Sequence, residues 1–142
     1  MKRKWLGIAS LMAVASVLLS QPSCARSRQL VSITVYPPGS SVTLTAIGQQ
    51  FPIQFTAYGN YIHPPETRDL TKTAVWATDA PDILTIAPNT PGGFLTTGNG
   101  CGTNLGVTAS VYTDNNNPSG NVVVGLATVN VTIEVGGTTV CQ

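Results

Sequence analysis

The chain has 142 residues, of which 9% are charged, and its formal net charge is +1. Three of its seven basic residues lie in the first four positions, so the remainder carries four basic residues against six acidic ones, a net charge of −2. Such a chain lacks the basic surface that neutralises phosphates, which counts against nucleic-acid binding. Its length fits one domain behind a leader, not two domains.

The leader comprises residues 1–24. It begins with the basic stretch "MKRK" and continues with an apolar run over residues 5–19. A helix that spans a bilayer needs about 20 apolar residues, and this run is shorter. The pattern is typical of a cleaved secretory signal helix. We therefore expect an exported protein that belongs to the cell envelope or is secreted.

Cys24 follows the apolar run directly, and two fates remain open for it. The stretch resembles a bacterial lipoprotein signal, with the small residue Ser23 just before a cysteine that becomes lipidated; Gln21 and Pro22 depart from that pattern. The rival is ordinary cleavage after Ala25, which would discard Cys24. We favour lipidation of Cys24, because a cysteine at this place is otherwise hard to explain in an exported chain. Residues 25–29 would then form a short tether.

Residues 30–142 read as one β domain, because apolar residues alternate at period two or form short runs broken by turn residues. Within residues 30–37 the alternation places Val31, Ile33 and Val35 on one face. Residues 61–70 read as a loop, since paired prolines remove backbone donors. The expected strands are residues 30–37, 42–48, 51–59, 73–79, 82–88, 93–98, 104–112 and 122–135. Seven or eight short strands in one domain predict an antiparallel β-sandwich.

The two remaining cysteines fit this prediction. Residues 104–112 and 122–135 form a hairpin, so the start of one strand lies beside the end of the other. Cys101 precedes this hairpin and Cys141 follows it, which places both at the same end. We expect a disulfide between them, and hence an oxidising compartment.

The sequence between residues 30 and 135 resembles bacterial immunoglobulin-like domains of group 2, the modules repeated in intimin- and invasin-type surface proteins. The resemblance is carried by "SITVYPPGSSVTLTAIGQQFPIQFTAYG", "VWATDAPDILTIAP" and "GFLTTGNGCGTNLGVTASV". Matching positions are Ile33, Pro37, Gly48, Gln49, Phe55, Trp76, Asp79, Ile83, Ile86, Gly93, Leu95 and Val107. The proline-rich stretch 61–70 and the cysteine pair depart from the family, and a single copy replaces its usual tandem repeats. The resemblance implies an immunoglobulin-like sandwich, with Trp76 between its sheets.

Residues that could carry chemistry are few. His63, the only histidine, shares the stretch 61–70 with Glu66 and Asp69, while Asp79 and Asp82 flank a turn. We interpret these as loop and turn residues and expect no catalytic residue, cofactor or metal. The "DNNN" stretch at residues 114–117 lacks the acidic density of a Ca²⁺ loop. A small hydrolase that pairs His63 with Asp69 or Asp79 is the remaining enzyme hypothesis.

The expected function is therefore non-catalytic: structural support, or binding of an envelope protein or polysaccharide, with membrane contact only through a lipid on Cys24. Free sheet edges of a sandwich are able to accept another strand. The alternative is a carbohydrate-binding accessory domain. It requires Tyr58, Tyr61 and Trp76 to cluster on one exposed face.

Overall fold

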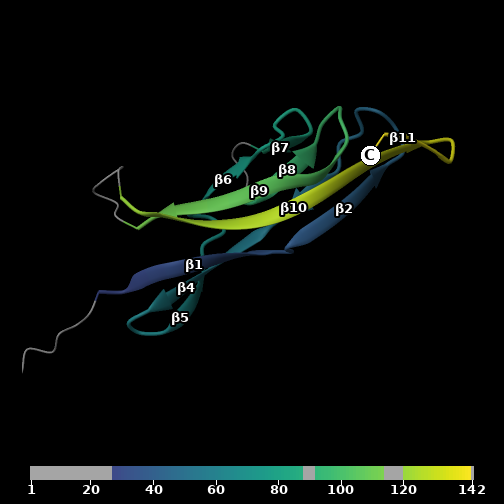
Figure 1. Ribbon diagram of the computed structural model, residues 1–142. Helices are drawn as coiled ribbons and strands as arrows, with labels where there is room; N and C mark the ends of the chain where they lie inside the picture. Colours follow the sequence, from purple (N-terminus) through teal and green to yellow (C-terminus); the bar gives the residue numbers. More distant parts are fainter. Residues whose placement is uncertain (1–26, 88–91, 114–119, 142) are drawn as a thin grey trace, which may run out of the picture.

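The structure is a computed structural model that describes residues 27–87, 92–113 and 120–141. These residues form eleven strands in three sheets and contain no helix (Figure 1). The all-β prediction is confirmed. The expected leader, including Cys24, lies outside the described residues.

The largest sheet is built around one long strand, β10 (Val122–Val135). Along one edge of β10 lie β9 (Gly102–Tyr112) and then β11 (Thr138–Cys141), both antiparallel to it. On its other edge β2 (Gly39–Leu44) pairs with the C-terminal half of β10. The strand β6 (Val75–Thr78) pairs with β9 and closes the sheet as an edge strand.

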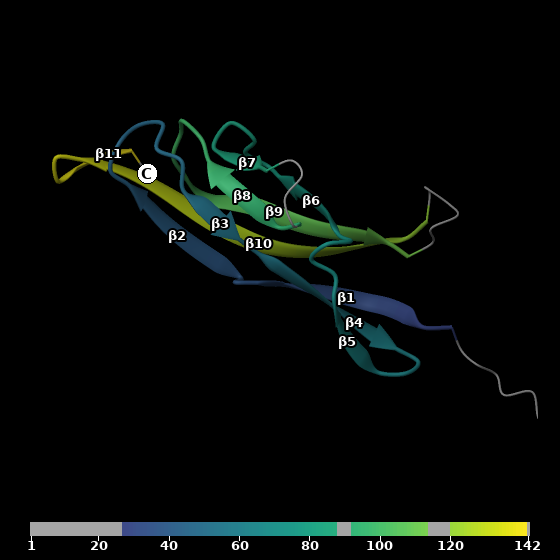
Figure 2. The same cartoon turned by 180° about the vertical axis from the view of Figure 1, so that it is seen from behind.

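Two three-stranded sheets lie on the other side of the core. One has the order β1 (Gln29–Tyr36), β4 (Thr56–Ile62) and β5 (Glu66–Asp69). The other has the order β3 (Pro52–Gln54), β8 (Phe94–Thr97) and β7 (Leu84–Ile86), and Figure 2 shows it in front of β9 and β10. Only Phe55 separates β3 from β4, so the two sheets continue into each other.

One hydrophobic core joins the three sheets. Phe55, Leu44, Leu84 and Leu95 are its largest apolar side chains that solvent does not reach. Because β10 contributes every second residue, its inner face is a row of buried side chains: Ala127, Val129, Val131 and Ile133. This is the period-two burial expected of a sheet with one face on the core.

Three features differ from the sequence prediction. The sheets are not wholly antiparallel, because β2 runs parallel to β10 from Gly39↔Thr128 to Leu44↔Ile133. Residues 61–70 are not a loop: β4 and β5 form a hairpin whose register includes Tyr61↔Glu66. Its two prolines lie in the turn, where no ladder donor is needed. The strand β11 was not predicted, and the described residues form eleven strands where seven or eight were expected.

Two residues at the starts of expected strands also lie differently in the structure. A shift in register between Leu30 and Ser32 inserts an extra residue into β1. Such a bulge turns the following side chains to the opposite face, so Leu30 is buried and Val31 is 47% exposed. Phe51, the first residue of the expected strand 51–59, lies just before β3 and is exposed.

Candidate functional site

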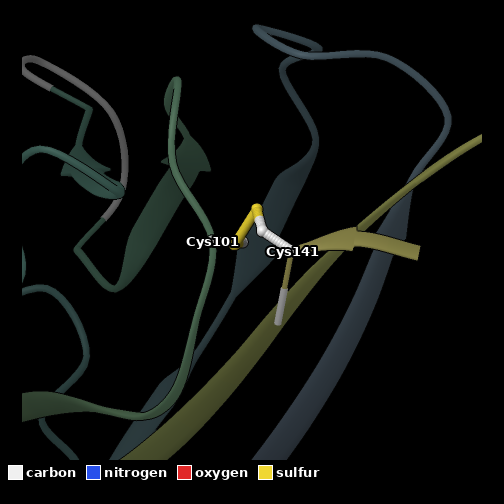
Figure 3. The surroundings of a disulfide bond; sticks show 2 residues. All are labelled: Cys101 and Cys141. Carbon is white, nitrogen blue, oxygen red and sulfur yellow. A yellow bond between two sulfur atoms is a disulfide. The ribbon is translucent and has the colours of Figure 1, made fainter.

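The disulfide joins Cys101 to Cys141 with an S–S distance of 1.99 Å and a Cα–Cα distance of 6.1 Å. Figure 3 shows it linking the segment before β9 to the end of β11. Ile133 explains the proximity, because it pairs with Leu44 on one edge of β10 and with Cys141 on the other. The strand β11 therefore continues the line of β9, and its last residue reaches Cys101. The expected pair is bonded, although a strand absent from the prediction positions it.

Trp76 packs against the core and also donates a hydrogen bond. Its indole is half-buried, lies 6.5 Å from the Phe55 ring between centroids, and donates from Nε1 to the Thr71 carbonyl oxygen at 2.9 Å. Thr71 is itself buried, and its Oγ1 accepts from the Ala57 amide at 2.9 Å. Trp76 is thus partly buried against the core. Its use of a buried threonine as anchor was not foreseen.

Gly93 provides the space that Trp76 needs. Its φ is +78°, and a Cβ at this position would collide with the Phe55 carbonyl and lie 2.9 Å from the indole Cζ2. Only glycine adopts this conformation without strain and allows so close an approach. Trp76, Thr71 and Gly93 therefore form a structural unit, not a ligand site.

The acidic residues near His63, Glu66 and Asp69, form ion pairs and hydrogen bonds within the fold. His63 lies exposed at the turn between β4 and β5. Glu66 pairs with Arg68 (Oε1–Nε 2.7 Å) and with Arg28 (Oε2–Nε 3.3 Å). The hydrogen bond and charge of Arg68, aided by Arg28, hold the pKa of Glu66 below its usual value. Asp69 accepts from the Thr71 amide at 2.8 Å, and its hydrogen bonds with Thr71 likewise lower its pKa.

Asp79 also has a structural partner. Its Oδ1 accepts from the Gly106 amide at 2.8 Å, which ties the end of β6 to β9. Among the described residues, no three His, Cys, Asp or Glu side chains are grouped so as to hold a metal ion. Nor does this part of the chain contain a helix long and apolar enough to cross a membrane. The "DNNN" stretch lies outside the described residues.

The three aromatic residues expected to form a carbohydrate platform do not share one face. Tyr58 is exposed on the outer side of β4, whereas Tyr61 points toward the core side and packs against its margin. Trp76 is half-buried against the core beside Phe55. The arrangement that the carbohydrate alternative required is therefore not present.

A groove of about 600 Å³ opens at the end of the molecule where β1 begins, and its lining includes Val75 and Ser110 of the five-stranded sheet; we call it the end groove. Tyr61 and Tyr112 line it together with Arg28, Leu30 and Val111. The Arg28 side chain is already paired with Glu66, and the Arg68 guanidinium lies 6.0 Å from the centre of the Tyr61 ring. Apolar and hydroxyl-bearing walls, with few charges, suit a neutral polar ligand better than an ion.

The outer side of the five-stranded sheet carries a second candidate, which we call the outer apolar face. Cross-strand pairing places Val75, Ser110 and Val124 in one row, and Ala77, Thr108 and Leu126 in the next. Tyr112 and Val122 form a third pair in the same register. The exposed fractions are 56% for Val75, 54% for Val124 and 63% for Leu126. The face is defined as Val75, Ala77, Tyr112, Val122, Val124 and Leu126.

The polar side chains within this face are already satisfied. Ser110 Oγ donates to the Val75 carbonyl oxygen at 3.2 Å, and Thr108 Oγ1 donates to that of Ala77 at 3.3 Å. Among the described strands β6, β9 and β10, Glu134 at the far end of β10 is the one charged residue. The face is thus apolar and uncharged, so its desolvation costs little free energy.

Sequence reasoning missed this face for an identifiable reason. Residues 122–129 read "VVVGLATV", which is apolar at both even and odd positions. Such a run is typical of a strand covered on both sides. The apolar residues of the outer surface were therefore visible in the sequence, but they were interpreted as part of the core.

No protein-family model matches the sequence, and no curated protein matches it either.

Proposed function

We propose that this chain is a non-catalytic module of the bacterial cell envelope, with an immunoglobulin-like sandwich fold, that supports envelope structure or binds a protein or glycan partner. In this proposal residues 1–24 direct export, and Cys24 carries the lipid that tethers the domain. The resemblance to bacterial immunoglobulin-like domains supports the fold, as does the two-sided arrangement of the sheets around one core.

The outer apolar face is the observation that carries a binding role. Natural monomers rarely expose large contiguous apolar patches, and those that they expose are often functional.

The carboxylates support a non-catalytic role, because Asp69, Asp79 and Glu66 each accept hydrogen bonds or form ion pairs within the fold. Carboxylates engaged in this way hold turns and strand ends together and are not poised for acid–base work.

Mass spectrometry of the protein from its native envelope tests this proposal. The expected result is an N-terminal Cys24 that carries acyl chains, together with an intact bond between Cys101 and Cys141. A mature chain that starts at Arg26 would remove the lipid tether and leave a secreted module. Recovery of the chain in the cytoplasm with its leader intact would overturn the envelope assignment.

A second candidate, glycan binding, is favoured by the end groove. Tyr61 and Tyr112 offer ring faces there for stacking against a sugar, and neighbouring hydroxyl groups are able to bond its oxygens. A glycan array probed with the protein tests it, using Tyr61→Ala as the variant and Tyr58→Ala as the control on the opposite face of β4. Binding that is lost equally in both variants, or never detected, contradicts the glycan assignment.

A further inference from the structure

The outer apolar face has the size of a dimer interface core. Five of its side chains, all but Ala77, are each 45–63% exposed. Together they present roughly 450 Å² of apolar surface, which is in the range of the largest patches on monomers. A stable interface buries about 800 Å² per partner, of which about two-thirds is apolar in homodimers. The face would supply most of that apolar share.

Its charge distribution fits a second copy of the same chain. In a two-fold symmetric dimer the same patch meets itself, so any charge near the axis faces a like charge. Within strands β6 and β9 and residues 122–133 of β10, all of them described, there is no charged side chain to create such repulsion. A strongly charged partner would find no complementary group here. The hydroxyls of Thr108 and Ser110 keep their donated hydrogen bonds to backbone carbonyls when the face is buried, so neither leaves an unpaired donor.

The geometry also suits sheet-on-sheet packing. Val122, Val124 and Leu126 stand at period two along β10, as the residues on the inner face of a sandwich do. Two such faces pack with their strands about 30° apart and their layers about 10 Å apart. The two copies would thus pack against each other in the same way as the sheets pack within one domain.

From these observations we propose that two copies of this chain associate through their outer apolar faces, around a two-fold axis near Ser110 and Val124. This proposal names a second copy of the chain as the partner of the outer apolar face, and in that it rests on the binding role proposed above; it does not depend on lipidation. Loss of the dimer would leave export and processing unchanged.

Sedimentation velocity across a concentration series tests the dimer. The full chain is expressed with its own leader, so that the host processes it, and kept in a density-matched detergent so that any lipid adds no apparent mass. The expected result is a monomer–dimer equilibrium in the micromolar range. A wild-type protein that stays monomeric up to about 200 μM overturns the proposal, because interfaces of this size normally associate below that concentration.

Two matched substitutions locate the interface. Val124→Asp should raise the dimer dissociation constant at least about tenfold, because it buries an unpaired charge. Val31→Asp is the control: it places the same change on an exposed valine of β1, in a different sheet, and should leave association unchanged. Equal loss in both variants, or a dimer that survives Val124→Asp, overturns the face assignment. The second outcome would point to edge pairing along β6 instead.

A charge-complementation experiment separates the interface from any folding defect. Val124→Asp and Val124→Lys should each be monomeric alone, because each would face its own charge across the axis. Their mixture should form a heterodimer, which a misfolded variant could not do. Failure of the mixture to associate, with both variants folded by circular dichroism, contradicts a symmetry axis close to Val124.

Discussion

The β4–β5 hairpin and the outer apolar face lie in different sheets and treat solvent in opposite ways. The edge strand β5 carries Glu66, Arg68 and Asp69 within four residues, all exposed or half-exposed. The edge strand β6 offers Val75 and Ala77 to solvent instead. Charges on an edge strand discourage other chains from pairing with it. The hairpin is therefore protected against association, whereas the surface around β6, β9 and β10 is not.

This difference teaches which part of the molecule is available to partners. Both regions rest on the same core and are linked through Thr71, which bonds Asp69 on one side and Trp76 on the other. Changes in the core or its fastenings should affect stability wherever they lie. Changes on the outer apolar face should affect association alone.

The largest effect on stability is expected from removing the disulfide. The bond closes a sequence separation of 40 residues, so the double substitution Cys101→Ser with Cys141→Ser should lower the free energy of unfolding by up to about 4 kcal/mol. Urea unfolding followed by circular dichroism measures it. Because the bond lies at the end of β9 away from Tyr112, a folded double variant should still dimerise. If reductant destabilises the double variant as much as the wild type, the loss does not come from this bond.

A somewhat smaller effect is expected at Trp76, and its neighbour provides the comparison. Trp76→Ala should cost about 3 kcal/mol, because it leaves a cavity beside Phe55 and removes the bond to Thr71. Val75→Ala, one position away on the outer face, should change stability by less than about 0.5 kcal/mol. Both are measured by urea unfolding at concentrations below dimer formation. A similar loss of unfolding free energy in the two variants would contradict the assignment of Trp76 to the inner face of β6 and Val75 to its outer face.

The smallest effect on stability is expected from a change of pH, which should act through the carboxylates of the β4–β5 hairpin. The pKa values of Glu66 and Asp69 are lower in the folded chain than their ordinary values, so their charged forms stabilise the fold. This contribution is complete above the ordinary carboxyl pKa and is lost as the pH falls through the lowered values. The urea midpoint should therefore decline as the solution is acidified below about pH 4.

Asp69→Asn tests that assignment. It should lower the urea midpoint at pH 7 and make the acid decline shallower than in the wild type. High salt should weaken the share of Glu66, which comes from exposed ion pairs, more than the share of Asp69, which comes from short hydrogen bonds. Superimposable acid profiles of wild type and Asp69→Asn would contradict a role for the Asp69–Thr71 contact.

Several features of the fold could be predicted from residue patterns. The alternation within residues 104–112 and 122–135 predicted the β9–β10 hairpin. The expected strands 82–88 and 93–98 correspond to β7 and β8, which pair with each other. Local pattern suffices here, because period-two burial and turn chemistry are properties of neighbouring residues. The expected place of Trp76 between the sheets came from the family resemblance and not from local pattern. The candidate surface was not predicted.

By itself, the sequence determined an all-β chain, the order of its main strands and the two cysteines that bond. Only the tertiary structure decided that β2 runs parallel to β10, that a bulge turns Val31 outward, and that β11 brings Cys141 to Cys101. It also decided that Val124 and Leu126 face solvent. The reason is physical: an apolar side chain is buried only if another layer of the fold packs against it. Which faces of a sheet are covered depends on contacts between residues far apart in the chain.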